Sequence, residues 1–347
     1  MSLIKKEILA GTIRVNARDL RAYVKKTRGW KRIKKDFPEL IKIVQLFKAK
    51  GRFKDLVDKI NPNFLKGQLS ADGEVQGARI NILPSGEKLD KAYSLFASNL
   101  KIQDPDSDYH WDVLYQNKGG TWSYVYTLEK KRQHQDSKYK KVEEFEKRYN
   151  QLMNNVRRSL ADERDLMAVP MYTLLNTKMR IGNETYFKAH GHMGLSTLTN
   201  KNVKIDGNQV TFDYIGKDGV PIKISKNFSQ IYVKRLKPLL KNKFVFSKDN
   251  GLLDENDFKK AFARYCGKEF YPHIVRSHYA TMRVKNFLTK EKVTKEEVSK
   301  LFMSIAHDLG HRKFNKKTKE WQEHYAVTVS SYIQPKLIER IQKKINS

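Results

Sequence analysis

The residues of this sequence that could act on a substrate lie in its C-terminal half, each at the edge of an expected structural element. Arg180 opens the string RIGNETY after a helix, and Lys217 lies in the turn of DYIGKDG. Arg276 lies in PHIVRSHYAT at the start of a helix, His311 closes DLGH, and Tyr332 lies in SSYIQP near the end of the chain. This combination of residue types suits attack on a phosphodiester.

The transition state of such an attack carries extra negative charge on the non-bridging phosphate oxygens. Two guanidiniums can bind these oxygens in a bidentate manner, which lysine does less well, and an imidazole can add a third donor. The tyrosine oxygen is then the nucleophile. A lysine in a mobile hairpin, its pKa lowered by neighbouring cations, can protonate the leaving 5′-oxygen. Because the arginines neutralise the charge, we expect no metal ion to be needed.

The string RIGNETYFKAHGHMGLSTLTNKNVKI, followed by FDYIGKDG, resembles the core of the compact type IB DNA topoisomerases of the poxvirus and bacterial type. The later boxes also agree: an Arg with His three residues before it, then G-H, then S-x-Y-I near the end. The resemblance covers roughly residues 120–335 and has five boxes in the order of that family. It implies Arg180 and Arg276 as phosphate clamps, Lys217 as general acid, His311 as oxygen stabiliser and Tyr332 as nucleophile.

The resemblance further implies transient cleavage of one DNA strand through a 3′-phosphotyrosyl bond, followed by religation. The sequence contains no G-x-x-x-x-G-K-[ST] phosphate loop, so we expect relaxation of supercoils without ATP and without any cofactor. Each box residue alone has an ordinary explanation, because a lone Arg180 is typical of a surface or helix-capping cation and Lys217 of a solvated turn lysine.

The sequence departs from the compact members between the G-H box and the tyrosine. There the basic segment RKFNKKTKEWQEHYAVTV intervenes, and it contains a second tyrosine, Tyr325. We favour Tyr332 as the nucleophile because VTVSSYIQP fits the family box and HYAVT does not.

His273 precedes Arg276 by three residues and resembles the H-x-x-R box of tyrosine recombinases. It is either a second phosphate donor or a substitute for a helix N-cap. We interpret His190, His192, His278 and His307 as structural, because their spacing forms no metal site. The single cysteine, Cys266, is interpreted as a packed thiol at the end of a helix.

Aromatic and basic residues gather around residues 122–132 and look like the seam that contacts DNA phosphates in the family. They are Tyr124, Tyr126, Lys130, Lys131 and Arg132. The alternative is that aromatic residues of the strand cover a core, and by alternation along the strand we expect this to explain one of the two tyrosines.

The elements that must position these residues follow from periodicity and turn signals. WDVLYQ, NKGG and TWSYVYTL predict a β-hairpin, and the segment around the DGN and GKDG turns predicts a three-stranded antiparallel sheet. Apolar spacing predicts helices at 139–160, 163–176, 228–240, 254–266, 274–288, 293–307 and 330–345.

Residues 1–60 hold 18 Lys and Arg against six Asp and Glu and are mostly helical in period. Leu40, Ile43, Val44 and Phe47 share one helical face. An arm along DNA and a solvated face over an ordinary core are equal alternatives for this segment.

We therefore predict an α+β protein in three parts. Residues 1–60 form a basic helical extension, 61–135 a β-containing N-terminal DNA-binding domain, and 136–347 a mainly α-helical catalytic domain with a small antiparallel sheet. The family implies that these parts form a C-shaped clamp around DNA.

The composition agrees with a nucleic-acid partner. The 347-residue chain has a formal net charge of +31, and no apolar run approaches the length of a membrane span. We expect a monomeric protein that binds double-stranded DNA, inside a DNA-containing compartment and not secreted. A tyrosine site-specific recombinase, suggested by His273, and a non-catalytic basic DNA-packaging protein are the alternatives.

Overall fold

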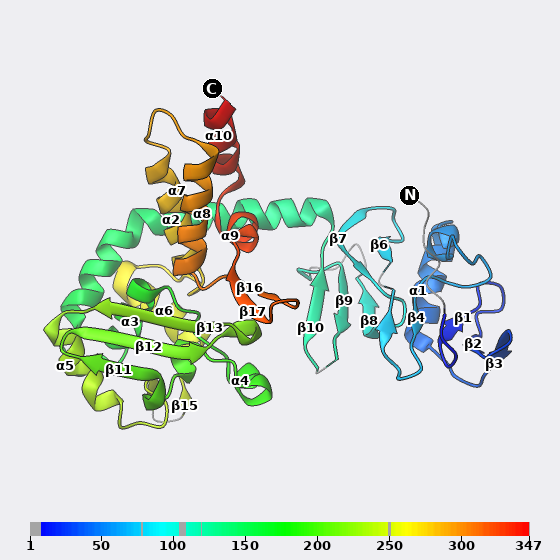
Figure 1. Cartoon of the computed structure of the whole chain (residues 1–347), viewed down its shortest axis with the longest axis horizontal. Helices are drawn as coiled ribbons and strands as arrows, with labels where there is room; N and C mark the ends of the chain where they lie inside the picture. Colours follow the sequence, from blue (N-terminus) through cyan, green and yellow to red (C-terminus); the bar gives the residue numbers. More distant parts are fainter. Residues whose placement is uncertain (1–7, 78, 104–108, 119, 249–250, 347) are drawn as a thin grey trace. The chain divides into compact units, whose positions relative to one another are not determined.

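The computed structural model describes residues 8–77, 79–103, 109–118, 120–248 and 251–346 of the chain. The chain divides into two compact units, Met1–Ser137 and Lys138–Ser347 (Figure 1). The content of helices and small antiparallel sheets confirms the predicted α+β class. The clamp implied by the resemblance stays a prediction. Within the described ranges no helix has both the length and the apolar character needed to cross a membrane.

The first unit begins with a five-stranded sheet of order β3-β2-β1-β4-β5. Its strands are β1 (Ile13–Val15), β2 (Ala22–Lys25), β3 (Trp30–Arg32), β4 (Gln68–Leu69) and β5 (Val75–Gln76). The prediction that residues 1–60 form a helical extension is therefore wrong for residues 13–32. Strand β1 pairs with β4, which lies beyond residue 60, and β2 and β3 continue the same sheet, so this segment is part of the unit and not an appendage.

One helix of this segment was predicted correctly. Helix α1 (Pro38–Ala49) buries Leu40, Ile43, Val44 and Phe47 on one face. These residues join Val15 in the core of the first unit. A short 3₁₀ turn, η1 (Phe53–Leu56), follows.

The rest of the first unit is built from hairpins. Its strands are β6 (Ile80–Ile82), β7 (Lys88–Tyr93), β8 (Ser98–Ile102), β9 (Val113–Gln116) and β10 (Trp122–Val125). The predicted hairpin is confirmed as β9 and β10, with Trp122 opposite Gln116. Val125 is buried, whereas Tyr124 is exposed and Tyr126 is half-buried on the same face of the chain. The expectation that one of the two tyrosines covers the core is therefore wrong, because residues two apart in an extended chain share a face.

Helices carry most of the second unit, and α2 (Leu128–Ser159) leads into it from the first. The others are α3 (Ala168–Thr177), α4 (Glu184–His190), α5 (Gln230–Leu239), α6 (Glu255–Cys266), α7 (Ile274–Phe287), α8 (Lys295–Asp308), α9 (Ala326–Tyr332) and α10 (Pro335–Asn346). The predicted helix 330–345 is in fact two helices. Ile333 is extended, and Gln334, the residue directly before Pro335, is disfavoured from helical conformation, so α10 starts afresh at the proline.

The predicted three-stranded antiparallel sheet is confirmed. It consists of β11 (Val203–Asp206), β12 (Gln209–Ile215) and β13 (Pro221–Asn227), and the 3₁₀ turn η4 (Lys217–Gly219) joins the last two strands. Two smaller hairpins complete the unit: β14 (Ser247–Lys248) with β15 (Gly251–Leu252), and β16 (Arg312–Asn315) with β17 (Glu320–Glu323).

Two hydrophobic clusters hold the second unit together. One joins α2, α3, α5 and α6 to the sheet, and it includes the fully buried Cys266, as predicted for a packed thiol. The other joins α7, α8 and α10, which lie together in Figure 1, and it includes Tyr332. The C-terminal end of α9 is thus part of a packed core.

Candidate active site

Tyr332 is the last residue of α9, and its side chain is only 2% exposed. Its hydroxyl lies 3.1 Å from Nη2 of Arg180, which donates a hydrogen bond to it. The ring of Tyr332 contacts two histidine rings, with centroid distances of 4.8 Å to His311 and 5.1 Å to His273. A phenol that accepts from a guanidinium is stabilised as it loses its proton.

The backbone that carries Arg180 is held by two glycines. Gly182 has φ +90°, a conformation that favours glycine, and Gly194 approaches it so closely that a Cβ there would lie 2.4 Å from the nitrogen of Gly182. Leu195 also donates its backbone N–H to the carbonyl of Arg180 at 2.8 Å. The RIG and GLST strings of the sequence therefore pack backbone to backbone and fix the direction of Arg180.

Arg276 is buried in α7 and reaches the same tyrosine from another side. Its Nη1 donates to the carbonyl of Lys178 and its Nη2 to the carbonyl of Leu309, each at 2.7 Å. Its guanidinium carbon lies 5.2 Å from the ring centroid of Tyr332. Backbone carbonyls orient this cation, so it is held in place before any substrate binds.

His311 links Arg276 to helix α9. Its Nε2 lies 3.1 Å from Nη2 of Arg276, and its Nδ1 lies 2.7 Å from Oγ1 of Thr328. Burial, together with the charges of Arg276 and Arg180, lowers the pKa of His311 to about 3, so the ring is neutral at pH 7. Because arginine can only donate, we assign Nε2 as the acceptor and the proton to Nδ1, which donates to Thr328.

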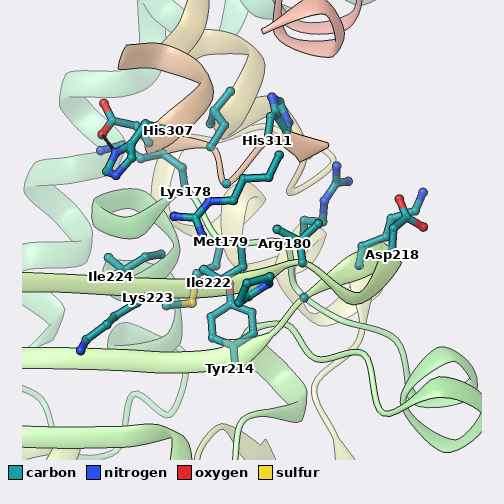
Figure 2. A pocket seen from close by; sticks show the side chains of 18 of the residues that line it. Lys178, Met179, Arg180, Tyr214, Asp218, Ile222, Lys223, Ile224, His307 and His311 are labelled. Atoms are coloured by element: carbon teal, nitrogen blue, oxygen red, sulfur yellow. Dashed lines mark ion pairs between the residues drawn. The ribbon is translucent and has the colours of Figure 1, made fainter. Parts of the chain in front are cut away.

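Arg180, Lys217, Arg276 and His311 line one cavity of about 340 Å³. Figure 2 shows Arg180 and Asp218 toward one end of this pocket and His307 and Lys223 toward the other. Lys217 is exposed in the η4 turn, next to Asp218. The structure thus brings four predicted residues to one pocket, and three of them, Arg180, Arg276 and His311, contact Tyr332.

Tyr325, the other candidate nucleophile, occupies a different environment. It precedes α9 and packs against Phe302, with a ring-centroid distance of 5.8 Å. Within the described part of the chain, no hydrogen bond or ring contact links it to Arg180, Arg276 or His311.

His273 lies at the N-cap position of α7, and its side chain makes no capping hydrogen bond. The interpretation as an N-cap substitute is therefore wrong. Its ring lies against Tyr332 and its side chain is exposed. Partial burial and the charges of Arg276 and Arg180 lower its pKa.

Two residues near Tyr332 were missed in the sequence. Lys138 of α2 donates its amine to the carbonyl of Ser331, and its Nζ lies 5.4 Å from the ring centroid of Tyr332. Burial lowers the pKa of Lys138 to about 8. No sequence signal distinguishes Lys138 from its neighbouring lysines. Thr328 did have a signal, because it precedes Tyr332 by four residues and so shares its helical face.

The predicted DNA-contact residues of the first unit lie around β10 and the start of α2. Lys130 pairs with Asp112 at 2.8 Å and Lys131 with Asp90 at 3.1 Å, whereas Arg132 is exposed. These pairs offset part of the positive charge that the sequence suggested for this seam.

The remaining histidines have ordinary surroundings. His278 is buried between Tyr149 and Phe145, and His190 packs against His192 at a centroid distance of 5.4 Å. His307 lies within 4 Å of carboxylates of Asp308 and Glu323. In the ranges that the structure describes, no three His, Cys, Asp or Glu residues are grouped as a metal site would require.

Comparison with known proteins connects this geometry to a family. Residues 127–344 match the family model of the eukaryotic DNA topoisomerase I catalytic core. The chain is also 32% identical over 126 residues to DNA topoisomerase 1B of vaccinia virus (strain Copenhagen) and to DNA topoisomerase I of monkeypox virus. Each match covers 36% of this chain and 38% of the relative's length.

Among solved structures, the chain is similar to the XerH site-specific recombinase bound to its difH substrate. The post-cleavage complex has a TM-score of 0.32 at 14% identity and covers 48% of this chain and 45% of that one. The pre-cleavage complex has a TM-score of 0.33 at 14% identity, covering 49% and 50%. At TM-scores this low, we draw no conclusion about this chain from the structural similarity.

The match to the family model spans most of the second unit and contains all five predicted catalytic residues. By this match the chain belongs to the family of the eukaryotic DNA topoisomerase I catalytic core.

Proposed function

We propose that this chain is a type IB DNA topoisomerase that relaxes supercoiled DNA through a transient 3′-phosphotyrosyl bond. The observation that carries the proposal is the convergence of Arg180 and Arg276 on the buried Tyr332. A single cation beside a tyrosine is common in proteins. Two arginines from different elements around one phenol, in a family of DNA topoisomerases, form a site suited to phosphoryl transfer.

The reaction begins when the oxygen of Tyr332 attacks the scissile phosphorus. The phenol loses its proton to water as the new O–P bond forms, and Arg180 stabilises the developing phenolate through its hydrogen bond. The guanidiniums of Arg180 and Arg276 bind the non-bridging oxygens, whose charge grows in the transition state. His311 contributes a third hydrogen bond to these oxygens in its other neutral tautomer, in which Nε2 carries the proton and Nδ1 accepts from the hydroxyl of Thr328.

The bond from phosphorus to the 5′-oxygen then breaks, and Lys217 protonates this leaving oxygen. The phosphotyrosyl ester conserves the bond energy of the broken phosphodiester. The free 5′-hydroxyl attacks it in the reverse reaction and the oxygen of Tyr332 leaves, so religation needs no ATP. While the strand is open, the downstream duplex rotates and supercoils are released.

Double-stranded DNA is the proposed substrate, bound by a monomer mainly through its phosphates. The net charge of +31 and the exposed Arg132, Tyr124 and His273 support this proposal. Contacts to phosphate give affinity that falls steeply with salt and only modest sequence preference.

Relaxation of a supercoiled plasmid in EDTA, with neither ATP nor magnesium, tests the proposal. We expect both negative and positive supercoils to be removed. An absolute need for magnesium or ATP would contradict the mechanism.

A tyrosine recombinase is the second candidate, because the ring of His273 lies against Tyr332 and the H-x-x-R spacing is typical of that class. The two candidates differ on a plasmid with no introduced recombination site. A topoisomerase relaxes it as a monomer, whereas a recombinase leaves its linking number unchanged until paired sites are supplied.

A further inference from the structure

The basic segment between His311 and Tyr332 forms a hairpin joined directly to the catalytic pocket. Strand β16 begins at Arg312, and the backbone N–H of His324 returns to the carbonyl of His311 at 3.4 Å. Phe314 lies opposite Trp321 in this hairpin, and their rings are 5.3 Å apart at an edge-to-face angle of 61°. Both ends of the hairpin therefore lie beside His311: β16 begins at the next residue, and His324, which follows β17, is hydrogen-bonded to the His311 carbonyl.

Trp321 is half-buried, and its ring lies near Gly219 of the turn between β12 and β13. A Cβ added at Gly219 would lie 3.9 Å from Cζ2 of Trp321 and 3.9 Å from Nε2 of His192. The rings of Trp321 and His192 are thus the nearest neighbours on the side of Gly219 where a side chain would project. Phe314, by contrast, is exposed.

The same turn carries Lys217. Asp218 has φ 63° and Gly219 has φ 78°, both in the left-handed region, and Gly216 donates its N–H to the carbonyl of Val220 at 2.7 Å. Lys217 is exposed, and within the described residues its amine has no hydrogen-bond or ion-pair partner. The position of the amine therefore depends on the turn, not on any contact of its own.

We propose that Trp321 is a positioning residue that holds the η4 turn so that Lys217 can protonate the leaving 5′-oxygen. In this step the Lys217 proton moves to the 5′-oxygen as its bond to phosphorus breaks and the bond from Tyr332 oxygen to phosphorus forms. The hairpin thereby connects the segment of His311 with the turn of the general acid. This inference rests on the proposed function.

The test is single-turnover cleavage of two nicked suicide substrates by the full chain. One has the ordinary 5′-bridging oxygen, and the other has a 5′-bridging sulfur, whose thiolate leaves without a proton. We expect Trp321→Ala to cleave the oxygen substrate roughly 10- to 100-fold more slowly than wild type, the size typical of a misplaced catalytic group. It should cleave the sulfur substrate near the wild-type rate.

Two further variants sharpen the result. Gln322→Ala, whose side chain is exposed on the neighbouring position of β17, is the matched control and should behave as wild type on both substrates. Trp321→Phe keeps an aromatic ring against Gly219 and should recover part of the lost rate.

The outcomes separate the inference from the proposed function. Equal slowing of both substrates, or no slowing of either, would overturn the positioning role of Trp321 while wild type still forms its adduct. If wild type forms no adduct on either substrate, the proposed function itself fails.

Discussion

Nη2 of Arg180 lies 3.1 Å from the hydroxyl of Tyr332, although the two residues are 152 positions apart in the chain. The contact joins the segment after α3 to the end of α9, and both ends are fixed by packing. Gly194 presses against the backbone beside Arg180, and Tyr332 is only 2% exposed. The phenol is therefore held beside a cation before DNA binds, which is the arrangement that an attacking tyrosine requires.

Lys217→Ala should slow cleavage of the ordinary substrate by roughly 10²- to 10⁴-fold, the usual loss when a general acid is removed. The 5′-bridging sulfur substrate should recover most of this rate. Single-turnover cleavage on both substrates measures the ratio. If both substrates are slowed equally, Lys217 contributes binding or positioning and donates no proton.

Lys138→Met should slow adduct formation by roughly 10-fold, a loss equivalent to about 1.4 kcal/mol of transition-state stabilisation. The reason is that the Lys138 cation lies over the ring of Tyr332 and holds the carbonyl of Ser331. Lys138→Arg keeps the charge and should retain most of the rate.

The pH dependence distinguishes a role of charge from one of packing at this position. The pKa of Lys138 is lowered to about 8, so wild type loses this cation as the pH rises through 8, whereas arginine stays charged. The cleavage rate of Lys138→Arg relative to wild type should therefore rise between pH 7 and pH 9.5. A ratio that stays flat over this range would exclude a role for the charge.

His278 should make the second unit less stable in acid. Burial lowers its pKa to about 4, below the ordinary value near 6.5 that it regains on unfolding. Between these values the unfolded chain binds more protons, so the free energy of unfolding falls as the pH falls, by up to about 1.4 kcal/mol per pH unit. Urea unfolding at pH 7, 6 and 5 measures this slope.

His278→Phe provides the comparison, because it keeps an aromatic ring between Phe145 and Tyr149. The variant should gain stability relative to wild type as the pH is lowered from 6.5 to 4. An unchanged difference across this range would show that His278 does not titrate as described.

The exposed cations from Lys26 to Lys35 test whether the first unit contacts DNA through its N-terminal sheet. Neutralising Lys26, Arg28, Lys31, Arg32, Lys34 and Lys35 to Gln should lower DNA affinity. The slope of log K against log salt should shrink by roughly 0.9 for each phosphate contact that is lost. An unchanged slope would mean that this face points away from DNA. Deleting residues 1–60 is a poorer test, because Val15, Leu40 and Phe47 belong to the core.

The sequence was most informative where local pattern and chemistry coincide. The alternation of residues and the GKDG turn predict the β12–β13 hairpin. The spacing of the apolar residues predicts the buried face of α1. Arg180 and Tyr332 were found because each lies in a string with its own recognisable turn or box. Their mutual contact followed only from the family resemblance.

Features that depend on distant pairing were not predictable in this way. Strands β1 to β3 are too short for a strong alternating pattern, and β4, which pairs with β1, lies more than 50 residues beyond that strand. Lys138 looks like any lysine of a charged helix, and only the fold brings it to Tyr332. The break between α9 and α10 was predictable, since Pro335 disfavours helix at the residue before it.

Tyr332→Phe removes one oxygen and keeps the ring that packs against His311 and His273. It should abolish the covalent adduct with little loss of stability and nearly unchanged DNA binding, because binding rests on phosphate contacts. Tyr325→Phe is the matched control. Tyr325 packs against Phe302 away from the arginines, so adduct formation should stay near the wild-type level.

The most direct measurement is to trap the adduct on a nicked suicide substrate and to identify the modified peptide by mass spectrometry. We expect DNA on the peptide that contains Tyr332, in wild type and in Tyr325→Phe, and no adduct in Tyr332→Phe. An adduct on Tyr325, or one that survives in Tyr332→Phe, would contradict this expectation.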